Sequence, residues 1–575
     1  MKNLPVKPAI LSIVIASLVL SACHAGSDET NTETIGPASN ATSRPDIPLI
    51  ANQTTVSQTQ EAAARAERME LDRLASTQVF NSQAPMHAES RLGMPQDLIY
   101  WPEQGTENYA DFDDSGIQRV IENAVSTFSI DVDTGSYSNM RRFLNQGTLP
   151  PADAIRAEEL INYFTYDYPV AVTDTPFSVI TEISASPWNT GKHLVHIGIK
   201  TNEPVSTAEM ASNLVFLVDV SGSMASPDKL DLLKTSLLML SRQLSADDSV
   251  ALVVYAGASG VVLEPTAGNK THLISAALER LQAGGSTNGA AGIELAYALA
   301  EEAFIADGIN RVILATDGDF NVGISDVNTL KDLIKDKRES GISLTTLGFG
   351  TGNYNDQLME QLADTGNGNY AYIDNINEAR KVLVDERYST LQTVAKDVKI
   401  QIEFNPAVVA EYRLIGYENR ALAREDFNND RVDAGEIGAG HTVTAIYEIA
   451  LLDSDSLSVD PLRYDRENIS TGGFTEEIAF LKLRYKEPDA DISLLLERAL
   501  MVADIEENID STSDNYRFSA AVAGLAQLLR GSDQTSMLDY DTVLNLAQGA
   551  RGDDEFGYRS EFIQLVRNAR ALSSI

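Results

Sequence analysis

The hydrophobic pattern of the chain changes near residue 213 and again near residue 390. Between these points, short and almost continuously apolar runs alternate with longer amphipathic segments. Continuous apolar runs are typical of strands buried on both faces of a parallel sheet, and strand–helix alternation predicts a doubly wound α/β domain. The predicted strands cover residues 213–219, 249–255, 310–316 and 343–348, and the predicted helices cover 226–244, 271–281, 289–306, 326–340, 356–364 and 376–388.

The segments on either side of this α/β region follow a different pattern. Residues 126–137 and 177–200 contain strand-like stretches, and residues 136–164 contain two short helices broken at Gly147. After residue 390, four stretches alternate apolar and polar residues, which is typical of antiparallel strands with one buried face. The economical architecture is therefore one β-rich domain into which the α/β domain is inserted, followed by a helical C-terminal region.

These patterns predict six regions along the chain. In order they are a signal peptide, a polar tether, an N-terminal flanking region of short helices and strands, the α/β domain, the β-rich continuation and the helical C-terminal region: 1–22, 23–115, 116–210, 211–392, 393–488 and 489–575.

The first residues have the features of a lipoprotein leader. Lys2 and Lys7 precede an apolar core, residues 9–20, which is too short to span a bilayer, and the core ends in "LSAC". Cys23, the only cysteine in the chain, ends this sequence, which resembles the lipobox of bacterial lipoproteins. The resemblance implies cleavage before Cys23, acylation of this residue and a membrane anchor. The alternative is an ordinary secretory signal. His24 in place of an aspartate favours the outer membrane, facing the periplasm.

Composition limits the partners of the chain. Lys and Arg number 44 against 83 Asp and Glu, a formal net charge of −39. This balance argues against nucleic-acid binding, which needs a basic surface. No further segment is apolar enough to cross a membrane in the mature chain. Residues 61–76 predict a helix with a thin apolar stripe, either a solvated stalk or a helix for a partner.

Candidate chemistry begins at "VFLVDVSGSM", where a buried strand ends on Asp219, Ser221 and Ser223. The carboxyl ends of strands in open α/β sheets are where ligands bind, and hard oxygen ligands suit Mg²⁺. Thr287 lies in a Gly-rich loop that opens a helix, and Asp317 ends another buried strand. All five residues are expected on one edge of the sheet. The alternative is that Asp219 and the serines only cap the first helix.

The three separated motifs resemble the metal-ion-dependent adhesion site of von Willebrand factor type A domains, over residues 212–388. The resemblance implies that Ser221, Ser223 and Thr287 bring hydroxyl oxygens to Mg²⁺, or to Mn²⁺ or Ca²⁺. Asp219 and Asp317 would bind the ion directly or through water. It also implies that an acidic side chain of a partner protein completes the coordination.

The flanks resemble a family of bacterial envelope lipoproteins with a central type A domain. The resemblance rests on "TFSIDVDTGSYSNMRRFLNQGTLPPADAIRAEELINYF", on "RFSAAVAGLAQLLRGS" and on "GYRSEFIQLVRNA", and with them it extends over residues 126–571.

Two acidic segments leave alternatives open. Asp131 and Asp133 in "DVDTGSY" either hold a turn together, which is the commoner role, or belong to a second metal site. Asp426, Asn428 and Asp430 resemble a calcium loop, but Arg431 stands where that motif needs glycine and Ile437 where it needs glutamate. An acid-rich hairpin loop is the alternative.

Three functions are consistent with these features. The first is a non-catalytic, metal-dependent binding protein tethered to the envelope. The second is an envelope scaffold whose metal ion is purely structural. The third is a metal-assisted hydrolase, for which Asp319 is the nearest candidate base.

Overall fold

A computed structural model describes residues 107–171, 175–202, 210–286, 289–318, 327–460, 474–488, 490–535 and 537–574. All of them belong to one compact unit of the chain. The predicted lipidation site Cys23, the predicted helix at 61–76 and Asp319 lie outside the described residues.

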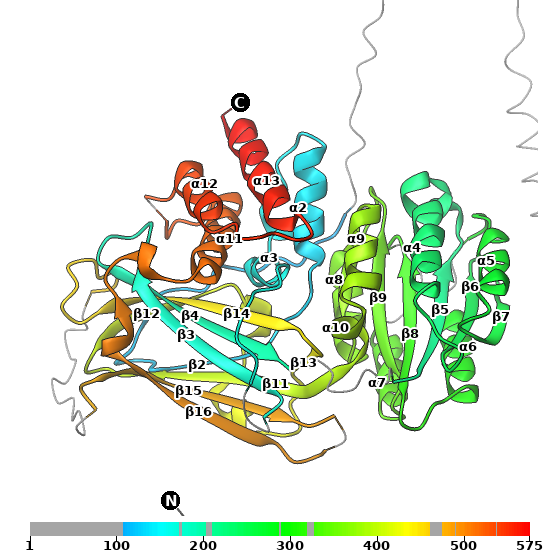
Figure 1. Cartoon of the computed structure of the whole chain (residues 1–575), viewed down its shortest axis with the longest axis horizontal. Coiled ribbons are helices and arrows are strands. Elements are labelled where there is room, and N and C mark those ends of the chain that lie inside the picture. Colours follow the sequence, from blue (N-terminus) through cyan, green and yellow to red (C-terminus); the bar gives the residue numbers. More distant parts are fainter. Residues whose placement is uncertain are drawn as a thin grey trace, which may run out of the picture. The chain divides into compact units, whose positions relative to one another are not determined.

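The inserted domain, residues 210–392, is built on a six-stranded sheet in the order β10-β9-β8-β5-β6-β7 (Figure 1). Its strands pair in parallel except for β7, which is antiparallel to β6. The bounds are β5 (Ser212–Asp219), β6 (Ser249–Tyr255), β7 (Ser259–Ala267), β8 (Ile309–Thr316), β9 (Ser343–Phe349) and β10 (Tyr370–Ile373). The prediction of a mostly parallel, doubly wound sheet is confirmed.

Helices cover both faces of this sheet, because the central strand β5 is apolar on both of its faces. Leu214, Phe216 and Val218 lie in one core with helices α4, α5 and α9. Val215 and Leu217 lie in a second core with α6, α7 and α8. The helices are α4 (Leu232–Ser241), α5 (Thr271–Glu279), α6 (Ala290–Glu302), α7 (Val327–Arg338), α8 (Asp356–Thr365) and α9 (Ile376–Arg380). The last predicted helix, at 376–388, consists of α9, a π-helical turn η4 (Lys381–Asp385) and α10 (Arg387–Leu391).

The surrounding β domain is a sandwich of two sheets. Each sheet combines strands that precede the inserted domain with strands that follow it. One has the order β1-β12-β14-β4-β3-β17; the other has the order β13-β11-β15-β16, and β2 also pairs with β11. The bounds are β1 (Gln118–Arg119), β2 (Val125–Ser129), β3 (Phe177–Ala185), β4 (Lys192–Thr201), β11 (Thr393–Phe404), β12 (Val409–Ile415), β13 (Gly435–Gly438), β14 (Thr442–Leu451), β15 (Glu477–Lys486), β16 (Leu494–Met501) and β17 (Ile505–Glu506).

The pairing of β4 with β14 shows how the domains are connected. Strand β4 precedes the inserted domain and β14 follows it, yet they pair antiparallel over nine residues, from Lys192↔Ala450 to Lys200↔Thr442. The two sheets enclose one apolar core, which includes Val195 and Ile197 from β4 and Ile400 and Ile402 from β11. The predicted insertion of one domain into another is confirmed.

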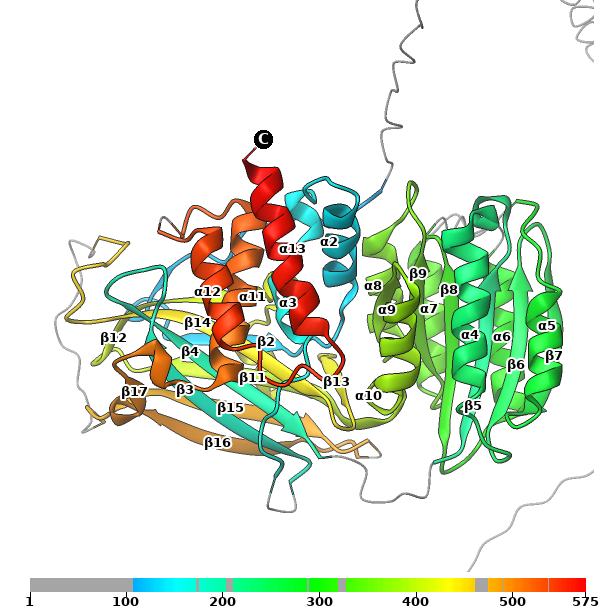
Figure 2. The same cartoon turned by 45° about the horizontal axis from the view of Figure 1, so that its top comes forward.

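A helical layer packs on the sandwich and combines both ends of the described chain (Figure 2). Its helices are α2 (Gly135–Asn145), α3 (Ala157–Asn162), α11 (Asp514–Arg530), α12 (Tyr540–Gly549) and α13 (Tyr558–Ser573). Phe164, which follows α3, makes edge-on ring contacts with Phe518 of α11 and Phe562 of α13. The ring centroids are 4.9 Å and 5.7 Å from that of Phe164. Helices α11 to α13 confirm the predicted helical C-terminal region.

The start of that region differs from the expectation of helix from residue 489. Residues 494–501 form strand β16, which pairs antiparallel with β15 from Tyr485↔Leu494 to Glu477↔Met501. The sequence "LLLERALM" favours helix locally, but pairing with a sandwich strand overrides this preference.

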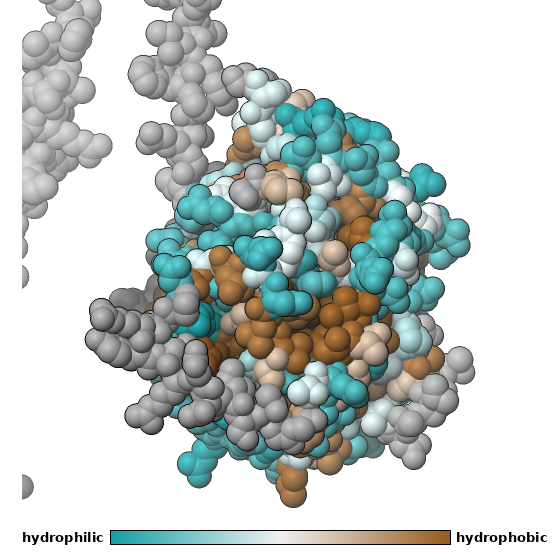
Figure 3. Space-filling view, turned by 90° about the vertical axis from the view of Figure 1, so that its left-hand side faces the viewer, coloured by the Kyte–Doolittle hydropathy of each residue, from teal (hydrophilic) through white to brown (hydrophobic). Residues whose placement is uncertain are grey.

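One face of the molecule carries a hydrophobic area bordered by hydrophilic residues (Figure 3). Among the described residues, no helix has both the length and the apolar character required to cross a membrane.

Candidate metal centre

The carboxyl ends of β5 and β8 bring the first two predicted acids to the same edge of the sheet. The parallel register pairs Val218 with Ala315, so the next residues, Asp219 and Thr316, end their strands at the same level. Asp317 follows directly. In an open α/β sheet this edge is the usual position for a ligand.

The carboxylate of Asp219 is held in one orientation by three donors. Its Oδ1 accepts a hydrogen bond from the backbone N–H of Ser221 at 2.8 Å. Its Oδ2 accepts from Thr316 Oγ1 at 2.9 Å and from the hydroxyl of Tyr255 at 3.3 Å. Burial raises the pKa of Asp219 to about 6, and the negative charge of Asp317 acts in the same direction. A cation beside Asp219 would relieve this burial cost.

The two serines bring hydroxyl oxygens to the same loop. Ser221 Oγ and Ser223 Oγ lie 2.9 Å apart, across the start of the short 3₁₀ turn η2 (Gly222–Ala225). Ser221 is buried and Ser223 is exposed, so the pair extends from Asp219 towards solvent.

The Gly-rich loop before Thr287 is bonded to this serine loop. Gly222 donates its N–H to the carbonyl of Gly285 at 3.1 Å, and Gly284 donates to the carbonyl of Val220 at 2.8 Å. Thr287 itself lies outside the described residues, so its place among the ligands stays a prediction. The bonds of Gly284 and Gly285 nevertheless hold the preceding turn against the Asp219 loop.

Lys229 is a site residue that the sequence did not reveal. Its Nζ donates to Asp317 Oδ2 at 2.9 Å and to Asn353 Oδ1 at 3.3 Å. It lies in the π-helical turn η3 (Pro227–Asp231) and crosses Gly350, where an added Cβ would come within 2.3 Å of the lysine side chain. The only available signal was a lysine in the first turn of a predicted helix next to the candidate site.

The chemistry of these donors fits a hard divalent cation. Asp219, Asp317, Ser221 and Ser223 offer carboxylate and hydroxyl oxygens, which Mg²⁺ prefers to nitrogen or sulfur ligands. Lys229 compensates only one of the two negative charges. These four residues would hold the ion.

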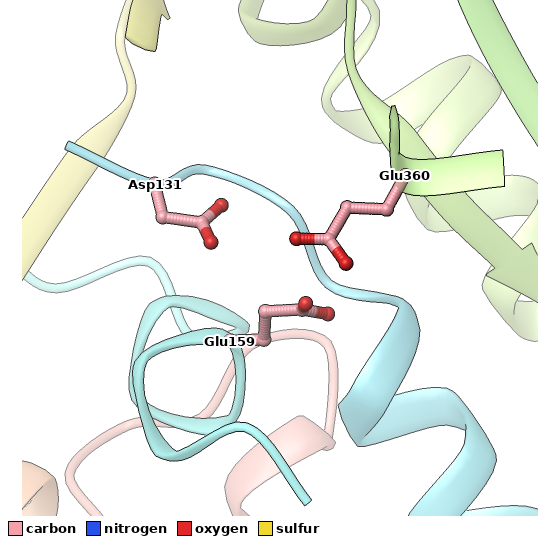
Figure 4. A group of neighbouring side chains, drawn as sticks. All are labelled: Asp131, Glu159 and Glu360. Atoms are coloured by element: carbon pink, nitrogen blue, oxygen red, sulfur yellow. The ribbon is translucent and has the colours of Figure 1, made fainter. Parts of the chain in front are cut away.

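A second acidic group lies where the inserted domain meets the rest of the chain. The carboxylates of Asp131, Glu159 and Glu360 point towards one another, and each offers an oxygen within 4.8 Å of the other two (Figure 4). They come from the β2–α2 connection, from α3 and from α8.

Two arginines bind this acidic group. Arg420 contacts Asp131 at 3.0 Å and Glu360 at 3.1 Å, and Arg156 pairs with Glu159. Asp131 Oδ1 also accepts the backbone N–H of Asp133 at 2.8 Å, which is the turn-holding role considered for this motif. The group therefore forms an ionic junction between the two domains, and the geometry favours the turn over a second metal site.

The junction extends further along α8. Arg420 also contacts Asp133 at 3.1 Å and Asp364 at 2.6 Å, and Arg156 pairs with Asp356 at the start of α8. We use the name ionic junction for this set: Asp131, Asp133, Arg156, Glu159, Asp356, Glu360, Asp364 and Arg420.

The acidic loop at residues 426–437 is organised by protein cations. Lys399 Nζ donates to the carbonyl oxygens of Asp426 at 3.2 Å and of Asn429 at 2.7 Å. The carboxylate of Asp430 pairs with Arg484 at 2.9 Å. Asn428 ends the 3₁₀ turn η6 (Arg424–Asn428). These contacts favour an acid-rich hairpin loop over a calcium loop.

Comparison with known proteins matches three separate parts of the chain to known families. Residues 213–385 match the von Willebrand factor type A domain, residues 103–196 match a von Willebrand factor family, and residues 389–572 match the C-terminal domain of the uncharacterized protein YfbK. YfbK of Escherichia coli K12 is 47% identical over 479 residues, which cover 82% of each chain. The protein sll0103 of Synechocystis is 27% identical over 191 residues, covering 33% of this chain and 44% of that protein. A solved von Willebrand factor type A protein from Catenulispora acidiphila is 16% identical, covers 68% of this chain and 91% of that chain, and has a TM-score of 0.37. The extent and identity of the match to YfbK show that this chain belongs to the YfbK family, with a von Willebrand factor type A domain at its centre.

Proposed function

We propose that this chain is a non-catalytic binding protein of the bacterial envelope, in which a divalent ion captures an acidic side chain of a partner protein. The observation that carries the proposal is the convergence of Asp219, Ser221 and Ser223 at the end of β5, beside Asp317 at the end of β8. Type A domains commonly mediate protein interactions, which is consistent with this role.

The charges at the site support capture of an acid. Two carboxylates and one lysine have a formal sum of −1, and a bound divalent ion would change that sum to +1. An ion with few charged ligands retains positive charge and attracts a carboxylate, whereas the metal-free site, on a chain of net charge −39, repels one.

The same contacts argue against a hydrolase. A metal-assisted hydrolase needs a base positioned to activate water. Asp219 already accepts three hydrogen bonds, and Asp317 pairs with Lys229. Neither of these two carboxylates is therefore placed as a general base, and Asp319, the nearest candidate base, lies outside the described residues.

Acylation of Cys23 would place the binding domain on a membrane, which we propose is the outer membrane facing the periplasm. The alternative function is a scaffold whose metal is purely structural. The ionic junction is consistent with that alternative, because its ion pairs hold the inserted domain to the rest of the chain.

Metal binding is tested first, by calorimetry of the full chain with Mg²⁺ and Mn²⁺. Asp219→Ala and Thr287→Ala should each weaken binding at least tenfold, by about 1.4 kcal/mol or more. Thermal unfolding should remain cooperative, because the substitutions lie at the end of a strand and in a predicted loop at the edge of the sheet. Asp231→Ala is the matched control, because Asp231 is an exposed acid at the end of the nearby η3 turn. Unchanged affinity in both site variants would refute the metal assignment.

Partner capture is tested with the same proteins as bait in envelope extract. Wild-type chain in Mg²⁺ should recover a partner that Asp219→Ala, or wild-type chain in chelator, does not. Replacing one acidic residue of that partner by its amide should remove most of the affinity. Equal recovery under all conditions would overturn metal-dependent capture and leave the scaffold.

A further inference from the structure

A cavity of about 1360 Å³ lies away from the candidate metal centre, where three parts of the chain meet. Most of its lining residues come from three segments: 164–167 after α3, 385–392 at the end of the inserted domain, and 551–559 before and at the start of α13. Figure 2 shows the loop before α13 descending towards α10, and the hydroxyl of Tyr558 lies 3.4 Å from Asp385 Oδ2. The volume exceeds that of most small-molecule sites and suits a length of extended peptide.

The lining of this cavity is strongly acidic. It contains seven acidic and three basic residues, all within the described part of the chain. Two of the basic residues are held by backbone carbonyls: Lys200 donates to Gly440 at 2.7 Å and Arg559 to Ala550 at 3.0 Å. The third, Arg551, is exposed.

Three of the acids are available to a ligand. Asp385, Glu386 and Asp514 have ion-pair partners on their own segments, and Asp554 accepts two backbone N–H groups at the start of α13. The remaining acids, Asp167, Asp553 and Glu555, are exposed, and their carboxylates have no ion pair or hydrogen bond to any residue that the structure describes.

Aromatic rings line the cavity beside these acids. Phe556 is 56% exposed and stacks on Tyr558, with ring centroids 5.7 Å apart, and Tyr388 of α10 is 37% exposed. Guanidinium groups of the chain already lie over two lining rings: Arg559 is 5.8 Å from the ring centroid of Tyr166, and Arg387 is 4.7 Å from that of Tyr388. Exposed rings next to carboxylates are a favourable surface for arginine and lysine side chains.

We propose that this cavity binds a basic peptide segment of a partner protein. Its unpaired carboxylates would attract the cationic groups, and Phe556 would pack against their aliphatic stems or guanidinium planes. The formal net charge of −39 makes a second copy of this chain a poor occupant, because the copies repel each other. This interaction is separate from the proposed capture of an acidic residue and needs no metal ion.

Fluorescence anisotropy with the full chain tests the proposal. The probes are a labelled peptide of alternating arginine and glycine, a matched peptide with glutamine for arginine, and one with glutamate for arginine. Only the arginine peptide should bind, with an affinity that falls as salt rises. Binding should persist in chelator and in Asp219→Ala.

Matched variants identify the surface. Asp553→Asn combined with Glu555→Gln should weaken arginine-peptide binding about 3- to 10-fold, and Phe556→Ala about 2- to 5-fold. Arg551→Gln, which removes a positive charge from the same lining, should strengthen binding about 2-fold. Glu279→Gln combined with Glu302→Gln neutralises two exposed acids on α5 and α6 and should have no effect.

Several outcomes would overturn the proposal. These are absence of arginine-peptide binding, equal binding of the glutamine or glutamate peptide, or weaker binding by Arg551→Gln. Loss of arginine-peptide binding in chelator would move the interaction to the metal centre. An equal loss in the α5–α6 control would show that overall charge, and not this cavity, attracts the peptide.

Discussion

The ammonium group of Lys229 lies 2.9 Å from Oδ2 of Asp317, so a fixed positive charge is part of the acidic site at the end of β8. Both side chains are buried, and Asn353 provides a second acceptor for the ammonium at 3.3 Å. The ion pair places a positive charge beside the buried Asp317 side chain. It also opposes the approach of any further cation, so it sets both the stability of the metal-free domain and its affinity for an ion.

Replacing Lys229 by glutamine should therefore have two opposite effects. The metal-free chain should lose about 3 kcal/mol of stability, because the buried Asp317 loses the positive charge that lies next to it. The affinity for Mg²⁺ should rise about tenfold or more, because a like charge next to the ion is removed. Calorimetric titration and thermal unfolding, each with and without Mg²⁺, measure both effects. Lys335→Gln, an exposed change on α7, is the control, and equal Mg²⁺ affinity in both variants would contradict the role of Lys229.

Arg420 should be the most sensitive residue of the ionic junction. Its guanidinium contacts Asp131, Asp133, Glu360 and Asp364, and the first three carboxylates are almost fully buried. Arg420→Gln should lower the free energy of unfolding by about 3–5 kcal/mol, because it leaves buried carboxylates without compensation. Arg420→Lys should rescue only part of this loss, since one ammonium cannot reproduce the planar contacts.

Denaturant unfolding of the two Arg420 variants and of Arg424→Gln, an exposed neighbour, measures these differences. A loss from Arg420→Gln no larger than that from Arg424→Gln would show that the junction does not stabilise the fold.

The sequence predicted the core of the candidate metal centre because its signals are local. A buried strand that ends on an acid, followed by closely spaced serines, fixes both the edge of the sheet and the donor atoms. Lys229 could not be predicted as a site residue, because its contact with Asp317 depends on the path of the η3 turn across Gly350. Residue spacing does not encode that path.

The ionic junction could not be predicted for a related reason. Arg156 and Asp356 are 200 positions apart, and Arg420 lies 287 positions from Asp133. Such pairs depend on how the inserted domain packs against the rest of the chain. At β16, helix-favouring residues 494–501 pair instead with β15, which shows tertiary context overriding local preference.

Anchoring of the chain should depend on Cys23. Cys23→Ala should release the chain from the membrane fraction or leave it as an unprocessed precursor, because an acidic chain has little affinity for anionic lipid without acyl groups. Fractionation of envelopes, followed by mass spectrometry of the N-terminus, distinguishes these two results. A correctly processed variant that remains wholly with the membrane would exclude lipid anchoring.

Glu158 should make the stability of the chain depend on pH. The residue is buried; its Oε2 accepts the backbone N–H of Tyr417 at 2.9 Å, and its Oε1 has no hydrogen-bond partner among the described residues. Burial raises the pKa of Glu158 to about 8, and the charges of Glu418 and Asp131 act in the same direction. In the unfolded chain the carboxyl has its ordinary pKa of 4.5, so the folded chain binds the proton more tightly.

Protonation of Glu158 therefore favours folding, and the sign of the pH effect follows. Its contribution to stability is fully present below about pH 4.5 and is lost as the pH rises to about 8. Glu158→Gln, which resembles the protonated acid, should remove this loss and leave the chain more stable than wild type at pH 8, by on the order of a few kcal/mol. Unfolding in denaturant at a series of pH values measures the difference. Glu302→Gln, an exposed change, should keep the wild-type pH dependence; if Glu158→Gln keeps it as well, the buried carboxyl is not its source.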